Sequence, residues 1–260
     1  MSGPQVWSWL PAGALVNSVY RLCEASPFEE KYHAVRAAEE RLLSDTHVRQ
    51  LPDGTSLWNA SEWRIRSRSA ERLCRQLARQ GPGLQVLEVG CGNGWLSALL
   101  HRKGHEVLGI DPFTAELEQA ARVFPGPTFA RADLFTSPLP EAAFDAVVFA
   151  ASIQYFADPD AVLQRALKLL RPNGVVHVLD TVLYASDEAA VAAKDRSIAY
   201  FTGMEAAPMA DHYHAHQIDA FRRSGELRVV HAPSPFDRIR RLFGLDTSPF
   251  THVEIRHRSA

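Results

Sequence analysis

The chain has 260 residues, of which 46% are hydrophobic and 22% charged, a composition that excludes disordered and fibrous classes. Its 28 Lys and Arg stand against 30 Asp and Glu, so there is no global positive field to hold a polyanion, and the balance argues against nucleic acid as a partner. Three widely spaced cysteines without a CxxC pair fit a cytoplasmic location, and no apolar stretch approaches the roughly 20 residues of a transmembrane segment.

The first part of the chain, residues 1–83, shows no strand pattern, and we expect a helical N-terminal extension there. Apolar and small side chains recur at helical spacing across residues 62–80, with many arginines at the other positions. Gly81-Pro82-Gly83 ends that helix. We expect this extension to form a lid on the main domain that follows it.

From residue 84 to 260, short apolar runs alternate with helical stretches, which predicts an α/β domain with a doubly wound, mostly parallel, seven-stranded sheet. Strands are expected at 85–89, 106–110, 128–130, 144–149, 175–179, 227–231 and 251–256, the last two as an antiparallel pair. Helices are expected at 95–102, 114–123, 159–170, 186–200 and 211–224.

The strongest local signal is the turn that contains Gly90, Gly92 and Gly94, between a buried strand and a helix. Such a turn brings backbone close to a ligand and leaves amide groups free at the helix N-terminus. Its G-x-G-x-G spacing differs from the G-x-G-x-x-G dinucleotide fingerprint. Glu88 would repel a pyrophosphate, whereas it stabilises a ligand with a cationic amine and a sulfonium.

This motif resembles the first motif of class I S-adenosylmethionine-dependent methyltransferases, of the type 11-like kind. The resemblance runs in order over about residues 84–180. It includes Asp111-Pro112 after the second strand, Asp133-Leu134 after the third, residues 144–149, and the turn at 170–174. The resemblance implies that Asp111 binds the ribose hydroxyls, and that Asp133 and Leu134 flank the adenine. It also implies a cofactor wall of Glu88, Gly90, Cys91, Gly92, Asn93, Gly94, Ala151 and Ser152.

Alternatives remain open for several of these residues. Asp111 and Asp133 each follow a strand, where an aspartate often caps the next helix or turn. Cys91 lies at a helix N-terminus, where a thiol pKa can fall, so a nucleophile is one interpretation and packing beneath the cofactor is the other.

The methyl acceptor is expected over the loop that follows residue 149, since ligands in open α/β sheets lie beyond the carboxyl ends of the strands. Gln154 and Tyr155 are candidate acceptor-site residues, with packing as the alternative for Tyr155. His212 and His214 are candidate bases in a histidine-rich helix start that also contains His216. Alternate spacing on a helix weakens a metal site, and none is expected.

The residues ahead of the main domain supply Trp63 and Arg66, which we expect to cover the cofactor and reach its carboxylate. Together with Tyr32, Arg36 and Arg41, this stretch looks similar to a bacterial methyltransferase subgroup of undefined substrate. An arginine-rich surface helix is the alternative.

The sequence therefore predicts an enzyme that transfers a methyl group from S-adenosylmethionine to a small-molecule acceptor, at oxygen or nitrogen more than carbon, by direct displacement. Three alternatives stay open: a cofactor-binding module without turnover, a methyltransferase acting on RNA or protein, and a nicotinamide-dependent oxidoreductase. The acceptor and the oligomeric state are not fixed by the sequence.

Overall fold

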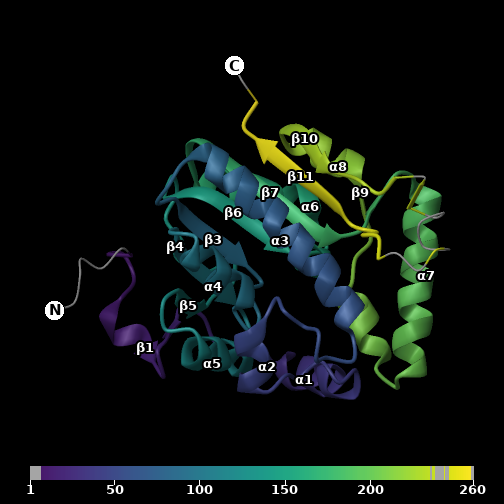
Figure 1. Ribbon diagram of the computed structural model, residues 1–260, viewed down its shortest axis with the longest axis horizontal. Helices are drawn as coiled ribbons and strands as arrows, with labels where there is room; N and C mark the ends of the chain where they lie inside the picture. Colours follow the sequence, from purple (N-terminus) through teal and green to yellow (C-terminus); the bar gives the residue numbers. More distant parts are fainter. Residues whose placement is uncertain (1–6, 235, 238–242, 244–245, 259–260) are drawn as a thin grey trace.

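A computed structural model describes residues 7–258, except 235, 238–242 and 244–245. Nine strands form one sheet in the order β1-β2-β5-β4-β3-β6-β7-β11-β10 (Figure 1). Their bounds are β1 Leu15–Val16, β2 Val19–Arg21, β3 Gln85–Val89, β4 Glu106–Asp111, β5 Thr128–Arg131, β6 Phe144–Ala150, β7 Leu170–Thr181, β10 Glu226–His231 and β11 Thr251–Arg256.

Helices cover both faces of this sheet. The helices are α1 Glu29–Ala38, α2 Asp45–Gln50, α3 Ala60–Gln80, α4 Trp95–Arg102, α5 Thr114–Val123, α6 Pro159–Leu169, α7 Asp187–Gly203 and α8 Ile218–Ser224, with short 3-10 turns η1 Ala12–Ala14, η2 Ile153–Tyr155 and η3 Ala207–His212. One core joins α3, α4 and α5 to the sheet, and the other joins α6, α8, Trp7 and Leu10 to its opposite face. The α/β class and the doubly wound sheet are thus confirmed.

The sheet reverses its direction of winding between β3 and β6, the two central strands. From β3 the chain proceeds outward through β4 to β5, and from β6 it proceeds to β7 on the other side. The pairs β3–β4, β4–β5, β3–β6 and β6–β7 are all parallel. Loops leaving the carboxyl ends of β3 and β6 separate above this switch point and leave room for a ligand.

The sheet has nine strands, so the expected number of seven was wrong. The two additional strands, β1 and β2, lie in the segment for which we expected none, and β2 pairs parallel with β5 through Tyr20 and Ala130. They have two and three residues. An alternating pattern needs about four to eight residues to be recognised, so strands this short leave no periodic signal.

In the C-terminal part, the expected strand pair was confirmed and one expected helix was wrong. Strands β10 and β11 form the expected antiparallel pair, and β11 joins the sheet antiparallel to β7. The single helix expected over residues 211–224 was wrong: η3 ends at His212, and the chain then passes through the two-residue strand β9 (His216–Gln217) before α8. Strand β9 pairs with β8 (Leu183–Tyr184). Among the described residues, no helix has the length and apolar character required to cross a bilayer.

Candidate functional site

A cavity of about 820 Å³ lies at the carboxyl ends of the parallel strands. Its floor is formed by the turn after β3, the ends of β4 and β7, and the loops after β5 and β6. Its roof is formed by α1, α3, the end of α7 and η3. Apart from Gly94 and His214, every predicted site residue lines it: Trp63, Arg66, Glu88, Gly90, Cys91, Gly92, Asn93, Asp111, Pro112, Asp133, Leu134, Ala151, Ser152, Gln154, Tyr155 and His212.

The glycine turn is built by close packing. Gly90 has φ +73°, and a Cβ placed there would lie 2.5 Å from the Cβ of Ser152 in the loop after β6. The Ser152 hydroxyl donates to the Val89 carbonyl at 2.5 Å, which fixes that loop against β3. A side chain at position 90 would overlap the Ser152 side chain and would require positive φ, so only glycine fits there.

Gly94 does not line the cavity and packs on the opposite side of the turn. It has φ +73°, precedes α4, and an added Cβ would lie 2.7 Å from both Ala120 Cβ and Phe129 Cζ. Its expected contact with a cofactor is therefore not seen in the cavity wall. The third glycine of the motif allows α4 to pack tightly against α5 and β5.

Glu88 is buried beneath the turn, where its carboxyl group accepts a hydrogen bond from the Ser97 hydroxyl at 2.5 Å. Burial raises its pKa to about 8, although the hydrogen bonds from Ser97 lower it. The neighbouring Cys91 thiol also has a pKa raised well above its usual value, first by burial and then by Asp111 and Glu88. A protonated thiol is a poor nucleophile, so this environment favours the packing role for Cys91.

Asp111 accepts backbone N–H groups from Gly92 and Phe113, both at 3.0 Å, and so joins the end of β4 to the glycine turn. Burial and then Glu116 raise its pKa to about 7. It does not cap α5, because Glu29 of α1 accepts the Thr114 and Ala115 amides there. The helix-cap alternative for Asp111 is thereby removed.

Asp133 is used locally by the loop that follows β5. Its Oδ1 accepts the Phe135 amide at 3.0 Å, the Thr136 amide at 2.8 Å and the Thr136 hydroxyl at 3.0 Å. The capping alternative therefore accounts for one of its oxygens. Asp133 and Leu134 still form part of the cavity wall.

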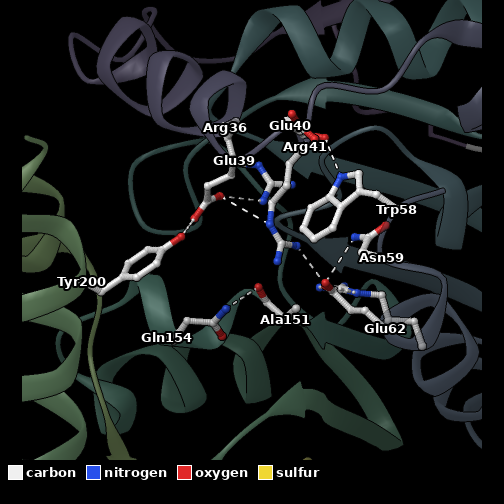
Figure 2. Close-up of polar contacts among 11 residues, drawn as sticks. Arg36, Glu39, Glu40, Arg41, Trp58, Asn59, Glu62, Ala151, Gln154 and Tyr200 are labelled. Carbon is white, nitrogen blue, oxygen red and sulfur yellow. Dashed lines mark hydrogen bonds and ion pairs between the residues drawn. The ribbon is translucent and has the colours of Figure 1, made fainter. Parts of the chain in front are cut away.

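The loop after β6 carries an ordered polar group and an aromatic group. Gln154 donates to the Ala151 carbonyl at 2.6 Å (Figure 2). It also accepts from the Thr181 hydroxyl at 2.8 Å, so both ends of its amide are held. The Tyr155 ring meets Tyr213 edge-to-face, with centroids 5.6 Å apart, and Tyr32 at 6.2 Å. Burial raises the Tyr155 pKa, while Arg36 lowers it.

The histidines were predicted on one helix start, and the structure separates them. His212 lines the cavity and its ring lies 3.9 Å from that of Phe28. His214 lies outside the wall; its backbone amide donates to the Gln154 carbonyl at 2.7 Å, and burial lowers its side-chain pKa. We find no cluster of His, Cys, Asp or Glu able to hold a metal within the described part of the chain.

The roof is held together by an ion-pair network centred on Arg41. Its guanidinium lies 3.5 Å from Glu39 and 3.0 Å from Glu62 of α3, and 6.0 Å above the Trp58 ring (Figure 2). Arg66 pairs with the same Glu62 at 2.9 Å. Glu39 also accepts the Tyr200 hydroxyl from α7 at 2.8 Å, so the network joins α1, α3 and α7.

Some wall residues were not predicted from the sequence. Glu116 of α5, Tyr213 and Asp180 at the end of β7 all line the cavity. No sequence motif marks Tyr213 or Glu116. Asp180 carries a usable signal, because an acidic residue at the carboxyl end of a buried parallel strand lies at the ligand edge of the sheet.

Residues 87–178 match the family described as "Methyltransferase domain". A malonyl-[acyl-carrier protein] O-methyltransferase of Serratia marcescens is 30% identical over 95 residues, which is 36% of this chain and 37% of the relative. A ubiquinone biosynthesis O-methyltransferase of Bradyrhizobium diazoefficiens is 32% identical over 115 residues, 43% and 45% of the two chains. The matches thus span about half the length of such relatives or less.

Solved structures share the fold. An S-adenosylmethionine-dependent methyltransferase from Mesorhizobium loti superposes with a TM-score of 0.51 at 20% identity, covering 76% of this chain and 98% of the other. A phosphoethanolamine N-methyltransferase from Haemonchus contortus, solved with S-adenosyl-L-methionine, gives 0.56 at 16% identity, covering 90% and 61%.

The chain carries a class I S-adenosylmethionine-dependent methyltransferase domain. The ordered motifs of the sequence, the sheet order and the matched relatives agree on this assignment. The matched relatives do not define the acceptor. One of them is an uncharacterized methyltransferase of Mycobacterium tuberculosis, which is 36% identical over 99 residues, or 37% of this chain and 50% of the relative.

Proposed function

We propose that this chain transfers a methyl group from S-adenosylmethionine to an oxygen or nitrogen of a small-molecule acceptor. One observation carries the proposal: a single cavity of about 820 Å³ reaches from the glycine turn to the aromatic groups around Tyr155. Two ligands can therefore be held side by side, and alignment of two reactants is the main requirement of a direct displacement.

The residues present fit the cofactor. Gly90 and Gly92 line the cavity without side chains, and the buried Trp63 Nε1 of the roof has no hydrogen-bond partner among the described residues. We assign the ribose hydroxyls to Asp111, the adenine to Asp133 and Leu134, and the amine to Glu88. Arg66 and Trp63 are assigned to the carboxylate end. When bound, S-adenosylmethionine supplies an electrophilic methyl group on a sulfonium.

The chain's own residues then orient the acceptor and exclude water. Gln154 is fixed at both ends of its amide, so it can hold Ala151 and Thr181 in place at the sheet edge. Tyr155 and Tyr213 offer ring edges and faces to an apolar acceptor. His212 is our candidate for removing the acceptor proton, since it lines the cavity whereas His214 does not.

The first test is calorimetric titration of the full chain with S-adenosylhomocysteine, and separately with NADH. We expect micromolar or tighter binding of the first and none of the second. Binding of NADH alone would favour the oxidoreductase alternative and overturn the proposal.

Turnover is tested by incubating the protein with methyl-labelled S-adenosylmethionine and a panel of phenols, alcohols and amines. Label in a small acceptor supports the proposed function. Label only in added RNA or protein would contradict the small-molecule part, and cofactor binding without transfer to any acceptor would support a binding module.

A further inference from the structure

Asp180 is a buried carboxyl group in the cavity wall that the assignments above do not use. It is the penultimate residue of β7 and only 4% exposed. Its predecessor Leu179 accepts the Ala151 amide at 3.0 Å, so Asp180 lies beside the loop where the acceptor is expected. The residue therefore lies in the cavity wall next to the loop that follows β6.

The Asp180 carboxyl group is incompletely satisfied. Its Oδ1 is sealed from solvent and has no hydrogen-bond partner among the described residues. Burial raises its pKa, whereas Arg66, a hydrogen bond from Ser69, and Arg72 lower it. A buried polar oxygen without a partner is unfavourable, and a hydrogen-bond donor on a bound ligand would satisfy it.

The backbone supports the same interpretation. Asp180 has φ +56°, a conformation uncommon for residues other than glycine, and strained residues often lie at ligand sites. Asp180 thus combines an uncommon backbone conformation with an unpartnered carboxyl oxygen at a residue of the cavity wall.

We propose that Asp180 binds the hydrogen-bearing nucleophile of a neutral or cationic acceptor, a hydroxyl or an amine, and excludes carboxylate acceptors. The inference rests on the proposed function and narrows its substrate class. A second carboxylate placed against Asp180 would be repelled in a site where water cannot screen the charges.

The test uses three probes that share one ring and differ in the head group: benzylamine, benzyl alcohol and benzoate. Each is titrated by NMR into the full chain saturated with S-adenosylhomocysteine. We expect benzylamine and benzyl alcohol to bind and benzoate to bind at least about tenfold more weakly. In Asp180→Asn, we expect benzylamine affinity to fall about tenfold and benzoate affinity to rise.

Asp145→Asn is the matched control, because Asp145 lies at the start of β6, away from the cavity, and bonds to Gln85 and Arg171. It should leave all probe affinities within twofold. The inference is overturned if no probe binds, if benzoate binds the wild type as well as benzylamine does, or if Asp180→Asn leaves the selectivity unchanged. The wild-type selectivity alone decides the matter if Asp180→Asn does not fold.

S-adenosylhomocysteine affinity separates the two proposals. If the wild type fails to bind it, the proposed function falls. If the wild type binds it and the probes show no head-group selectivity, the proposed function stands and only the role of Asp180 falls. Loss of S-adenosylhomocysteine binding in a folded Asp180→Asn would place Asp180 against the cofactor instead, and would also overturn the inference.

Discussion

At the scale of single residues, Glu88 and Asp111 are carboxyl groups buried in the cavity wall, with pKa values raised to about 8 and about 7. Burial disfavours their charged forms, and a cationic ligand would favour them. Their sequence positions were predicted from the motif alone. Their protonation could not be, because it depends on depth, on Ser97 and on Glu116, which the fold brings together.

The first prediction concerns Glu88. If it receives the ligand amine, its pKa falls on binding, so a proton leaves the protein when S-adenosylhomocysteine binds at pH 7. Calorimetry in buffers of different ionisation enthalpy should show this release, and affinity should weaken as the pH falls from 8 to 6. Glu88→Gln should abolish the release, whereas a buffer-independent heat for the wild type would contradict the assignment.

The second prediction concerns Asp111→Asn. Loss of the carboxylate should weaken S-adenosylhomocysteine binding about 10- to 100-fold, since the ribose loses a charged acceptor. The folded pKa lies above that of the unfolded chain, so Asp111 stabilises the free wild type at low pH, and this contribution is lost as the pH rises through about 7. The variant's melting temperature should therefore fall less than that of the wild type between pH 5 and pH 8. Equal slopes would argue against a buried, protonated Asp111.

At the scale of elements, the long strands and the helices of residues 85–169 were predicted within a residue or two, because buried strands and amphipathic helices leave clear periodicities. The short strands β1, β2, β8 and β9 were not, since two or three residues carry no period. The helix expected through His214 failed for a related reason. Residues 211–217 are mostly polar, and such a pattern is compatible with an extended loop as well as with the first turn of a helix.

The turn after β3 gives the third prediction. Gly90→Ala should destabilise the protein by about 2–4 kcal/mol, from positive φ together with overlap with Ser152. Ser152→Gly removes the overlapping Cβ, so the double variant should recover the part of the stability that the overlap costs. The part that comes from positive φ at position 90 should remain lost. Denaturant unfolding of the four proteins measures the coupling. Strict additivity would show that the overlap is not what excludes a side chain at Gly90.

The antiparallel pair of strands β7 and β11 gives the fourth prediction. His177 of β7 and His252 of β11 lie buried with ring nitrogens 3.3 Å apart. Burial lowers both pKa values, that of His252 to about 3. A base with a depressed folded pKa contributes stability above about pH 6.5 that is lost as the pH falls toward the folded pKa. Melting temperature should drop below pH 6, and His252→Gln should flatten that drop; an unchanged slope would place the acid sensitivity elsewhere.

At the scale of the whole molecule, the cavity wall includes residues of α1, α3 and α7. The Arg41 network ties these helices together, although they are separated by long stretches of sequence (Figure 2). The floor of the site could be predicted from ordered motifs. The roof could not be assembled from the sequence, since which arginines meet which glutamates is decided by tertiary packing.

The fifth prediction concerns this roof. Arg41→Ala should change the unfolding free energy by less than about 1 kcal/mol, since its ion pairs are partly exposed. It should nevertheless speed hydrogen exchange in α1 and weaken S-adenosylhomocysteine binding. Arg122→Ala, which removes the surface pair with Asp45, is the control and should do neither. Unchanged exchange in α1 would show that the network does not hold the roof.

The roof combines segments from distant parts of the chain, and this affects the order in which the site can form during synthesis. Phe250 lines the cavity together with Phe28, so the ligand pocket draws on both distant parts of the chain. A ribosome releases residues from the N-terminal end onward, and the parallel strands β3 to β7 emerge well before Phe250. The nascent chain can thus build its glycine turn early, yet a closed reaction chamber must wait until Phe250 has left the exit tunnel.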